Sequence, residues 1–189
     1  ELTNTIPNSF QFNQFENPAN PEIHERTTAK EIWEQSGHEV DGLVTGVGTG
    51  GTVTGCASFL KRVNPDCKIY AVEPKKSAVI SGENPGSHLI QGIGAGFIPK
   101  VLRKEFIDEI IQVDDDEAFY FGRMLAKMEG LLSGISSGAA LAAAIKVGER
   151  EELLNKKLIV ILPSFGERYL STAMFDANTS ISARKDGYL

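Results

Sequence analysis

One glycine- and threonine-rich stretch, Asp41-Gly-Leu-Val-Thr-Gly-Val-Gly-Thr-Gly-Gly-Thr-Val-Thr-Gly55, constrains this chain more than any other feature. A short apolar run breaks into glycines and then continues with a helical pattern, which predicts a strand, a tight turn and a helix. Glycines let the backbone approach a ligand closely, and the first N–H groups of a helix have no partner within it. A phosphate suits such a turn best, because backbone N–H groups and the hydroxyls of Thr49 and Thr52 can all donate to it.

The same glycines leave two other interpretations open. Gly46-x-Gly48-x-x-Gly51 also matches the dinucleotide fingerprint, and Glu73 stands at the end of the next predicted strand, where an acid that binds ribose belongs. A strand-to-helix turn without any ligand is the third interpretation. Because glycine costs about 1 kcal/mol relative to alanine at ordinary helical positions, a cluster of glycines still indicates a specific reason for their presence.

The composition is that of a globular protein of about one domain, with 189 residues, 41% hydrophobic and 23% charged. A net charge of −6 without a basic block argues against nucleic acid or an anionic membrane as a partner. No run approaches the roughly 20 apolar residues of a membrane span. Cys56, Cys67 and the scattered histidines lack metal-ligand spacing, so we expect buried, reduced thiols, no metal and a cytoplasmic location.

Hydrophobic patterning predicts alternating strands and helices along the chain. Strands are expected at the start of 9–21, before a loop rich in proline and asparagine, and at 43–47, 68–73 and 157–162. Helices are expected at 28–35, with Thr28 and Glu31 as a capping box, at 51–63, from about 114 to 130, and after the turn 133–138. This order predicts an α/β fold with an open, mostly parallel twisted sheet, helices on both faces and ligands beyond the carboxyl ends of the strands.

Two further segments carry specific expectations. The glycine-rich segment 81–99 is predicted to be a long loop, and long loops in compact domains are usually functional. The run Asp114-Asp115-Asp116 is expected to stabilise the N-terminal end of the following helix rather than to bind a cation, and Gly130 is expected to end that helix.

Six motifs, in this order, closely resemble cysteine synthase (O-acetylserine sulfhydrylase), a family of fold-type II enzymes that depend on pyridoxal 5′-phosphate (PLP). The motifs are Asn17-Pro-Ala-Asn-Pro21, Thr45-Gly-Val-Gly-Thr-Gly-Gly-Thr52, Val72-Glu-Pro74, Gln91-Gly-Ile-Gly-Ala-Gly-Phe-Ile-Pro99, Gly134-Ile-Ser-Ser-Gly-Ala139 and Pro163-Ser-Phe-Gly-Glu-Arg-Tyr-Leu-Ser171. The resemblance extends from near residue 1 to about residue 175. It implies an enzyme that replaces the leaving group on the β-carbon of O-acetyl-L-serine with sulfide, giving L-cysteine.

The resemblance also implies which residues form the site. The loop that holds the PLP phosphate is matched by Gly48, Thr49, Gly50, Gly51 and Thr52. Ser164 matches the residue that hydrogen-bonds the pyridine nitrogen, and a serine leaves that nitrogen neutral, which suits β-elimination. Without the resemblance, the alternative interpretation of Ser164 is an ordinary helix N-cap after a strand. Gln14, with its neighbour Asn13 as the alternative, matches a residue that contacts the substrate carboxylate, and Gly92 lies in the loop that closes on the substrate.

Two motifs that the resemblance implies are not in this sequence. In the family a lysine in a proline-serine-valine-lysine segment holds PLP as a Schiff base, and a threonine-serine-glycine-asparagine loop binds the substrate carboxylate. We therefore expect the C-terminal part of the enzyme, inactive alone and without a catalytic residue of its own. The expected division is 1–26 as the end of the smaller domain and the crossover, 27–175 as the PLP-phosphate-binding domain and 176–189 as a C-terminal tail.

The resemblance finally implies assembly and partners. We expect a homodimer in the cytoplasm, or in an organellar stroma or matrix, and the C-terminal tail of serine acetyltransferase as a partner in the active-site cleft. The alternatives are a cystathionine β-synthase-like or other fold-type II lyase, a non-catalytic fragment or paralogue, and an NAD-binding dehydrogenase.

Overall fold

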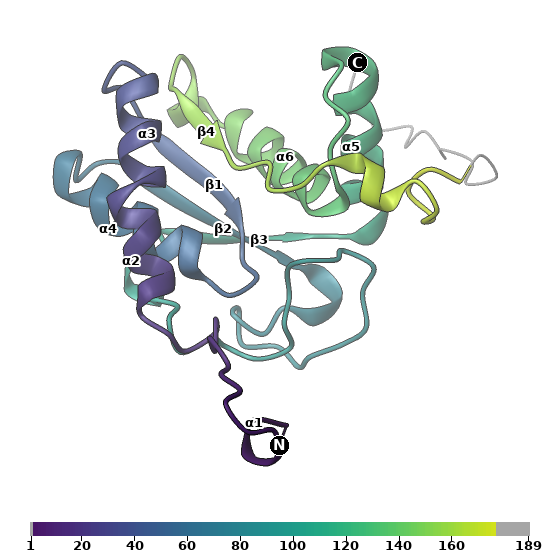
Figure 1. Ribbon diagram of the computed structural model, residues 1–189. Coiled ribbons are helices and arrows are strands. Elements are labelled where there is room, and N and C mark those ends of the chain that lie inside the picture. The colour runs from purple at the N-terminus through teal and green to yellow at the C-terminus, as the bar shows by residue number, and fades with distance from the viewer. Residues whose placement is uncertain (1, 177–189) are drawn as a thin grey trace.

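A computed structural model describes residues 2–176 of the chain (Figure 1). Within this range the centre of the fold is a four-stranded sheet in the order β3-β2-β1-β4, with every neighbouring pair parallel. The strands are β1 (Gly42–Gly46), β2 (Lys68–Pro74), β3 (Glu109–Val113) and β4 (Leu158–Val160). The α-helices are α1 (Leu2–Thr5), α2 (Ala19–Arg26), α3 (Thr28–Gln35), α4 (Gly51–Val63), α5 (Asp115–Glu129) and α6 (Ile135–Gly148).

Helices cover both faces of the sheet (Figure 1). Successive side chains of a strand point to opposite faces, and in β1 both faces are buried. Leu43 packs among residues of α3 and α4, whereas Val44 packs among residues of α5 and α6. The predicted α/β class, with a parallel sheet between two helical layers, is therefore confirmed.

The unit β1–α4–β2 forms as predicted. The expected helix bounds 51–63 are those of α4, and Asn64 ends this helix with its backbone N–H donating to the Leu60 carbonyl oxygen at 2.7 Å. Helix α5 also matches its prediction. Asp114 and Glu117 form a capping box at its start, and Gly130 follows its last residue in the left-handed conformation, with φ 70°.

Three local predictions are wrong. No strand forms in 9–15, because the segment has no strand beside it among residues 2–176, and Phe10 and Phe12 remain 77% and 78% exposed. Thr28 does not cap α3: the N-cap position is Thr27, and the Thr28 hydroxyl lies 2.9 Å from His24 Nδ1. The strand expected at 157–162 is shortened to β4 and is only half-buried, because it lies at the edge of the sheet.

Two helices and one strand were not predicted. Helix α1 is a short helix at the start of the described chain, helix α2 replaces part of the expected loop rich in proline and asparagine, and β3 forms the other edge of the sheet. Both predicted thiols are buried and free, and burial raises the pKa of Cys56 to about 12 and that of Cys67 to about 11. Among the helices of residues 2–176, none has the length and apolar character needed to cross a membrane. Of the predicted C-terminal tail, residues 177–189 lie outside the described part of the chain.

Candidate functional site

The turn between β1 and α4 is built around Gly50. This residue is the N-cap of α4 and has φ 85°, a left-handed conformation that side-chain-bearing residues adopt only with strain. A Cβ atom added there would also lie 3.0 Å from the side chain of Leu102. The glycine at position 50 therefore allows the chain to turn sharply from the end of β1 into the helix.

A second loop lies directly against this turn. A Cβ atom at Gly48 would collide with the carbonyl oxygen of Gly92, and the Gly94 N–H donates to the Val47 carbonyl oxygen at 3.0 Å. Gly92 itself has φ 94° and is exposed. The structure thus brings the 91–99 loop, which contains the candidate substrate residue Gly92, into backbone contact with the predicted phosphate-binding loop.

Helix α2 packs against the start of α4 on the other side of the turn. A Cβ atom at Gly51 would collide with the side chain of Asn20, and one at Gly55 would collide with the backbone of Pro21. Because both positions lack a side chain, polar groups of α2 reach the loop threonines. Asn20 Nδ2 lies 2.9 Å from Thr49 Oγ1.

His24, one turn further along α2, contacts the second loop threonine. Its Nε2 lies 3.4 Å from Thr52 Oγ1, and its Nδ1 lies 2.9 Å from the Thr28 hydroxyl. Residues four apart on a helix share one face, so α2 presents Asn20 and His24 side by side to the loop. Burial lowers the pKa of His24 from its ordinary value of 6.5, which favours the neutral imidazole between the two hydroxyls.

The lowered pKa of His24 predicts a pH-dependent stability. The unfolded chain takes up the proton near pH 6.5, whereas the folded protein takes it up only at lower pH, so stability falls as the pH drops below about 6.5. We expect His24→Gln to flatten this decline in the free energy of unfolding, measured with urea between about pH 7.5 and 5.5. Equal slopes for the variant and the wild type would contradict the assignment.

The polar groups around the turn fit a phosphate. Among the hydrogen bonds of residues 2–176, the backbone N–H groups of Thr49, Gly50 and Thr52 find no acceptor. These groups and the two threonine hydroxyls form a set of donors at the positive end of a helix that runs from Gly51 to Val63. An anion that accepts many hydrogen bonds, such as the phosphate of PLP, suits this set.

Ser164 lies at the same edge of the sheet. It follows β4, the parallel neighbour of β1. Val44 of β1 pairs with Val160 of β4, and Gly48 and Ser164 each stand four residues after one of these partners. Its carbonyl oxygen accepts from the Gly134 N–H at 2.8 Å. Ser164 is not a helix N-cap, because the short helix Gly166–Tyr169 begins two residues later. The alternative interpretation of Ser164 is therefore wrong, and its role toward a pyridine nitrogen stays a prediction.

Glu73 does not have the role that a dinucleotide site requires. The residue is 1% exposed, and its carboxylate accepts the N–H groups of Ile80 and Ser81, at 2.8 and 3.0 Å, and the Ser81 hydroxyl at 2.6 Å. These three bonds hold the beginning of the 81–99 loop. Because the carboxylate is buried and already accepts three hydrogen bonds, Glu73 is not placed to bind a ribose. The dinucleotide interpretation therefore lacks the acid that it requires after the second strand.

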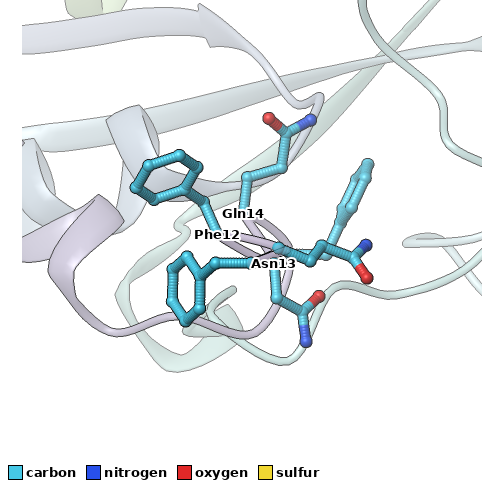
Figure 2. Close-up of a pocket in the computed structure, with 6 residues that line it drawn as sticks. Phe12, Asn13 and Gln14 are labelled. Atoms are coloured by element: carbon cyan, nitrogen blue, oxygen red, sulfur yellow. The ribbon is translucent and has the colours of Figure 1, made fainter. Parts of the chain in front are cut away.

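The segment containing Gln14 forms an exposed part of the site. Residues 10–15 line a shallow pocket, in which Figure 2 shows the side chains of Asn13 and Gln14 projecting in different directions. The Gln14 carbonyl oxygen accepts from Asn20 Nδ2 at 2.8 Å, so the same asparagine contacts this segment and the phosphate-binding loop. The structure therefore connects Gln14 to the candidate phosphate site through one side chain. No cluster of potential metal ligands occurs in residues 2–176.

Asn20 and His24 are the polar residues of the site that sequence reasoning missed. Both stand in α2, which begins inside the predicted loop of 9–21 and continues to Arg26, so the loop prediction does not show their common helical face. Asparagine often starts a helix, and Asn17 stands three positions before Asn20. His24 follows Asn20 by four positions, which is the spacing of residues on one helical face, and this pattern is the signal that could have found them.

Comparisons with known proteins agree with this geometry. The family described as pyridoxal-phosphate dependent enzyme matches residues 1–164. A cysteine synthase of Buchnera aphidicola (subspecies Schizaphis graminum) and cysteine synthase A of Escherichia coli K12 are each 54% identical to this chain over 170 residues. These alignments cover 86% of this chain and 53% of each relative, so the chain spans about half the length of the curated relatives it matches.

Solved structures show the same fold. A cysteine synthase from Entamoeba histolytica superposes with a TM-score of 0.89 at 47% identity, covering 92% of this chain and 51% of that one. An O-ureido-L-serine synthase superposes with a TM-score of 0.84 at 40% identity, covering 89% of this chain and 54% of that one. Both similarities extend over nearly the whole described chain.

Proposed function

Since the chain belongs to the family of pyridoxal-phosphate dependent enzymes, we propose that it is the C-terminal part of a cysteine synthase, which makes L-cysteine from O-acetyl-L-serine and sulfide. The observation that carries this proposal is the 54% identity to cysteine synthases across 86% of the chain. Because the chain spans about half of those relatives, the activity is proposed for the complete enzyme.

The cofactor would be held at the carboxyl edge of the sheet. PLP supplies an aromatic ring that takes up negative charge while the leaving group departs from the β-carbon. The residues from Gly48 to Thr52 would bind its phosphate. The N–H groups of Thr49, Gly50 and Thr52, which are unpaired within residues 2–176, support this assignment, as do the hydroxyls of the two threonines. Ser164 would hydrogen-bond the ring nitrogen from the end of the neighbouring strand, and its hydroxyl would leave that nitrogen neutral.

The substrate would lie between the two exposed segments beside this loop. Gln14 is proposed to contact the substrate carboxylate and Gly92 to lie in the loop that covers the substrate. The close contact of Gly92 with Gly48, and the bond of Asn20 to both Gln14 and Thr49, support a common site for cofactor and substrate. The family's Schiff-base lysine and its threonine-serine-glycine-asparagine loop would come from the rest of the enzyme.

We further propose a cytoplasmic or organellar homodimer whose active-site cleft also accepts the C-terminal tail of serine acetyltransferase. The support is the resemblance of the motifs, together with exposed apolar side chains in the loop that would line the cleft, Phe97 at 50% and Ile98 at 49%. Competition between O-acetylserine and a synthetic peptide ending in isoleucine tests the shared site, and sedimentation of the complete enzyme tests the dimer.

The activity is tested with the complete gene product. We expect L-cysteine to form from O-acetyl-L-serine and sulfide only when PLP is bound. Parallel reactions with homocysteine and with N-hydroxyurea as nucleophiles distinguish a cystathionine β-synthase-like enzyme and an O-ureido-L-serine synthase. A PLP-loaded enzyme that uses either nucleophile but not sulfide would contradict the proposed function.

A further inference from the structure

The orientation of the Asn20 side chain is fixed by its two hydrogen-bond partners. A backbone carbonyl oxygen can only accept, so the Asn20 atom that lies 2.8 Å from the Gln14 carbonyl oxygen must be the amide nitrogen. The same nitrogen lies 2.9 Å from Thr49 Oγ1. Asn20 therefore donates one proton to each partner, and Thr49 must act as the acceptor.

This arrangement determines what the Thr49 hydroxyl can still do. A hydroxyl has one proton and two lone pairs. Thr49 Oγ1 accepts from Asn20 Nδ2 and also from the Gly51 N–H, at 3.3 Å, which occupies both lone pairs. Among residues 2–176 no hydrogen bond uses its proton. The hydroxyl can therefore only donate to a further partner.

We propose that Asn20 is a positioning residue, which keeps Thr49 a hydrogen-bond donor toward the PLP phosphate and ties the Gln14 segment to the phosphate-binding loop. This inference rests on the proposed function. An anion needs donors, and an undirected hydroxyl could instead turn its proton toward a protein acceptor. Asn20 prevents this because its amide nitrogen has no lone pair to offer.

The packing of α2 against α4 supports this role. Gly51 and Gly55 have no side chains where α2 crosses, and a Cβ atom at Gly51 would occupy the position of the Asn20 amide. The contact therefore depends on glycine on one helix and asparagine on the other. His24 contacts Thr52 from the same face of α2, so this helix contacts both threonines of the loop.

The inference is tested by comparing two ligands of the apo form of the complete enzyme: PLP and pyridoxal, which lacks the phosphate. In Asn20→Asp a carboxylate of the same shape can only accept, so it would take the Thr49 proton and repel the phosphate. A hydrogen bond to a charged group contributes enough that we expect PLP affinity to fall about 10- to 100-fold. Pyridoxal affinity should stay within about twofold of the wild type.

Asn17→Asp provides the matched control. Asn17 Nδ2 also donates to a carbonyl oxygen of the upstream segment, that of Phe12 at 3.1 Å, but among residues 2–176 Asn17 forms no hydrogen bond with the loop threonines. The same change of amide to carboxylate should leave PLP affinity within about twofold of the wild type. Asn20→Ala serves as a second variant without added charge, and it should weaken PLP about tenfold.

Three outcomes separate the possibilities. Unchanged PLP affinity in both Asn20 variants would overturn the inference, and so would an equal loss of PLP and pyridoxal, which indicates a purely structural role. If Asn20→Asp does not fold, the test is the effect of Thr49→Val on PLP affinity, measured in the wild type and in the Asn20→Ala variant. Because the two residues are proposed to act together, an equal loss of affinity in both backgrounds would contradict the inference. A wild-type enzyme that binds no PLP would instead refute the proposed function.

Discussion

The 189-residue chain is expected to form no product that borohydride reduces at one defined lysine when PLP is added. The Schiff-base lysine implied by the resemblance stands in a proline-serine-valine-lysine segment, which this sequence does not contain. Lys75 and Lys76 directly follow β2, at the carboxyl end of the strand, where the candidate site lies. Both are paired with carboxylates, Lys75 with Asp114 at 3.2 Å and Lys76 with Asp115 at 2.7 Å. Asp115 raises the pKa of Lys76, so its amine stays protonated and is a poor nucleophile.

Mass spectrometry of peptides after borohydride reduction measures this directly. We expect only scattered, substoichiometric labelling of the chain by itself. Joined to a segment that carries the family's lysine motif, the protein should show one stoichiometrically labelled lysine and gain β-replacement activity, and the same segment with that lysine changed to alanine is the control. Stoichiometric labelling of a single lysine in the 189-residue chain would contradict the prediction.

Replacing Gly138 with alanine is expected to lower the free energy of unfolding by about 3 kcal/mol, near the upper end for overpacking. Helices α5 and α6 cross at this glycine with their backbones in contact. An added Cβ atom would collide with the Ala118 carbonyl oxygen and would lie 2.7 Å from the nitrogen and 2.9 Å from the Cα of Gly122. Because all three are backbone atoms, no side chain can move aside and the helices must separate. Urea denaturation measures the change.

Gly148→Ala is the matched control in the same helix. A Cβ atom at Gly148 would lie 3.6 Å from Leu158 Cδ1, an ordinary van der Waals contact. Since alanine is a better helix former than glycine, this variant should gain up to about 1 kcal/mol. A similar loss of stability in both variants would show that the α5–α6 crossing is not the cause.

The parts of the fold that the sequence predicted are those with strong local signals. In β1–α4–β2 an apolar run, a glycine turn, a helical pattern and a stop at Asn64-Pro65-Asp66 follow one another, and each agrees with the next. Helix α5 has acids at its start and glycine at its end, which is equally explicit. Local preference and tertiary packing favour the same structure in these segments.

The elements that were missed depend on distant contacts. Helix α2 begins within Asn17-Pro-Ala-Asn-Pro21, whose residues favour a turn locally, and it is stabilised where Gly51 and Gly55 let it pack on α4. Conversely, the alternation in 9–15 predicts a strand that has no neighbour to pair with in the described chain.

The candidate site shows the same division. The loop from Gly48 to Thr52 is recognisable because glycine and threonine have the required properties themselves. The contribution of Asn20 depends on a bond between residues 29 positions apart, which no local pattern reveals. Glu73 illustrates the opposite error: its position after a strand suggests a ligand, but three donors of the following loop occupy it.

The sheet order β3-β2-β1-β4 has a consequence for the kinetics of folding. Strands β1 and β2 are joined through one helix, whereas β1 and β4 meet only after a much longer segment, since the bonded residues Asp41 and Lys157 are 116 positions apart. Closing a long loop costs more chain entropy before any contact compensates for it, so β4 should dock after β1–α4–β2 has formed. The phosphate-binding turn should then form before Ser164 reaches it.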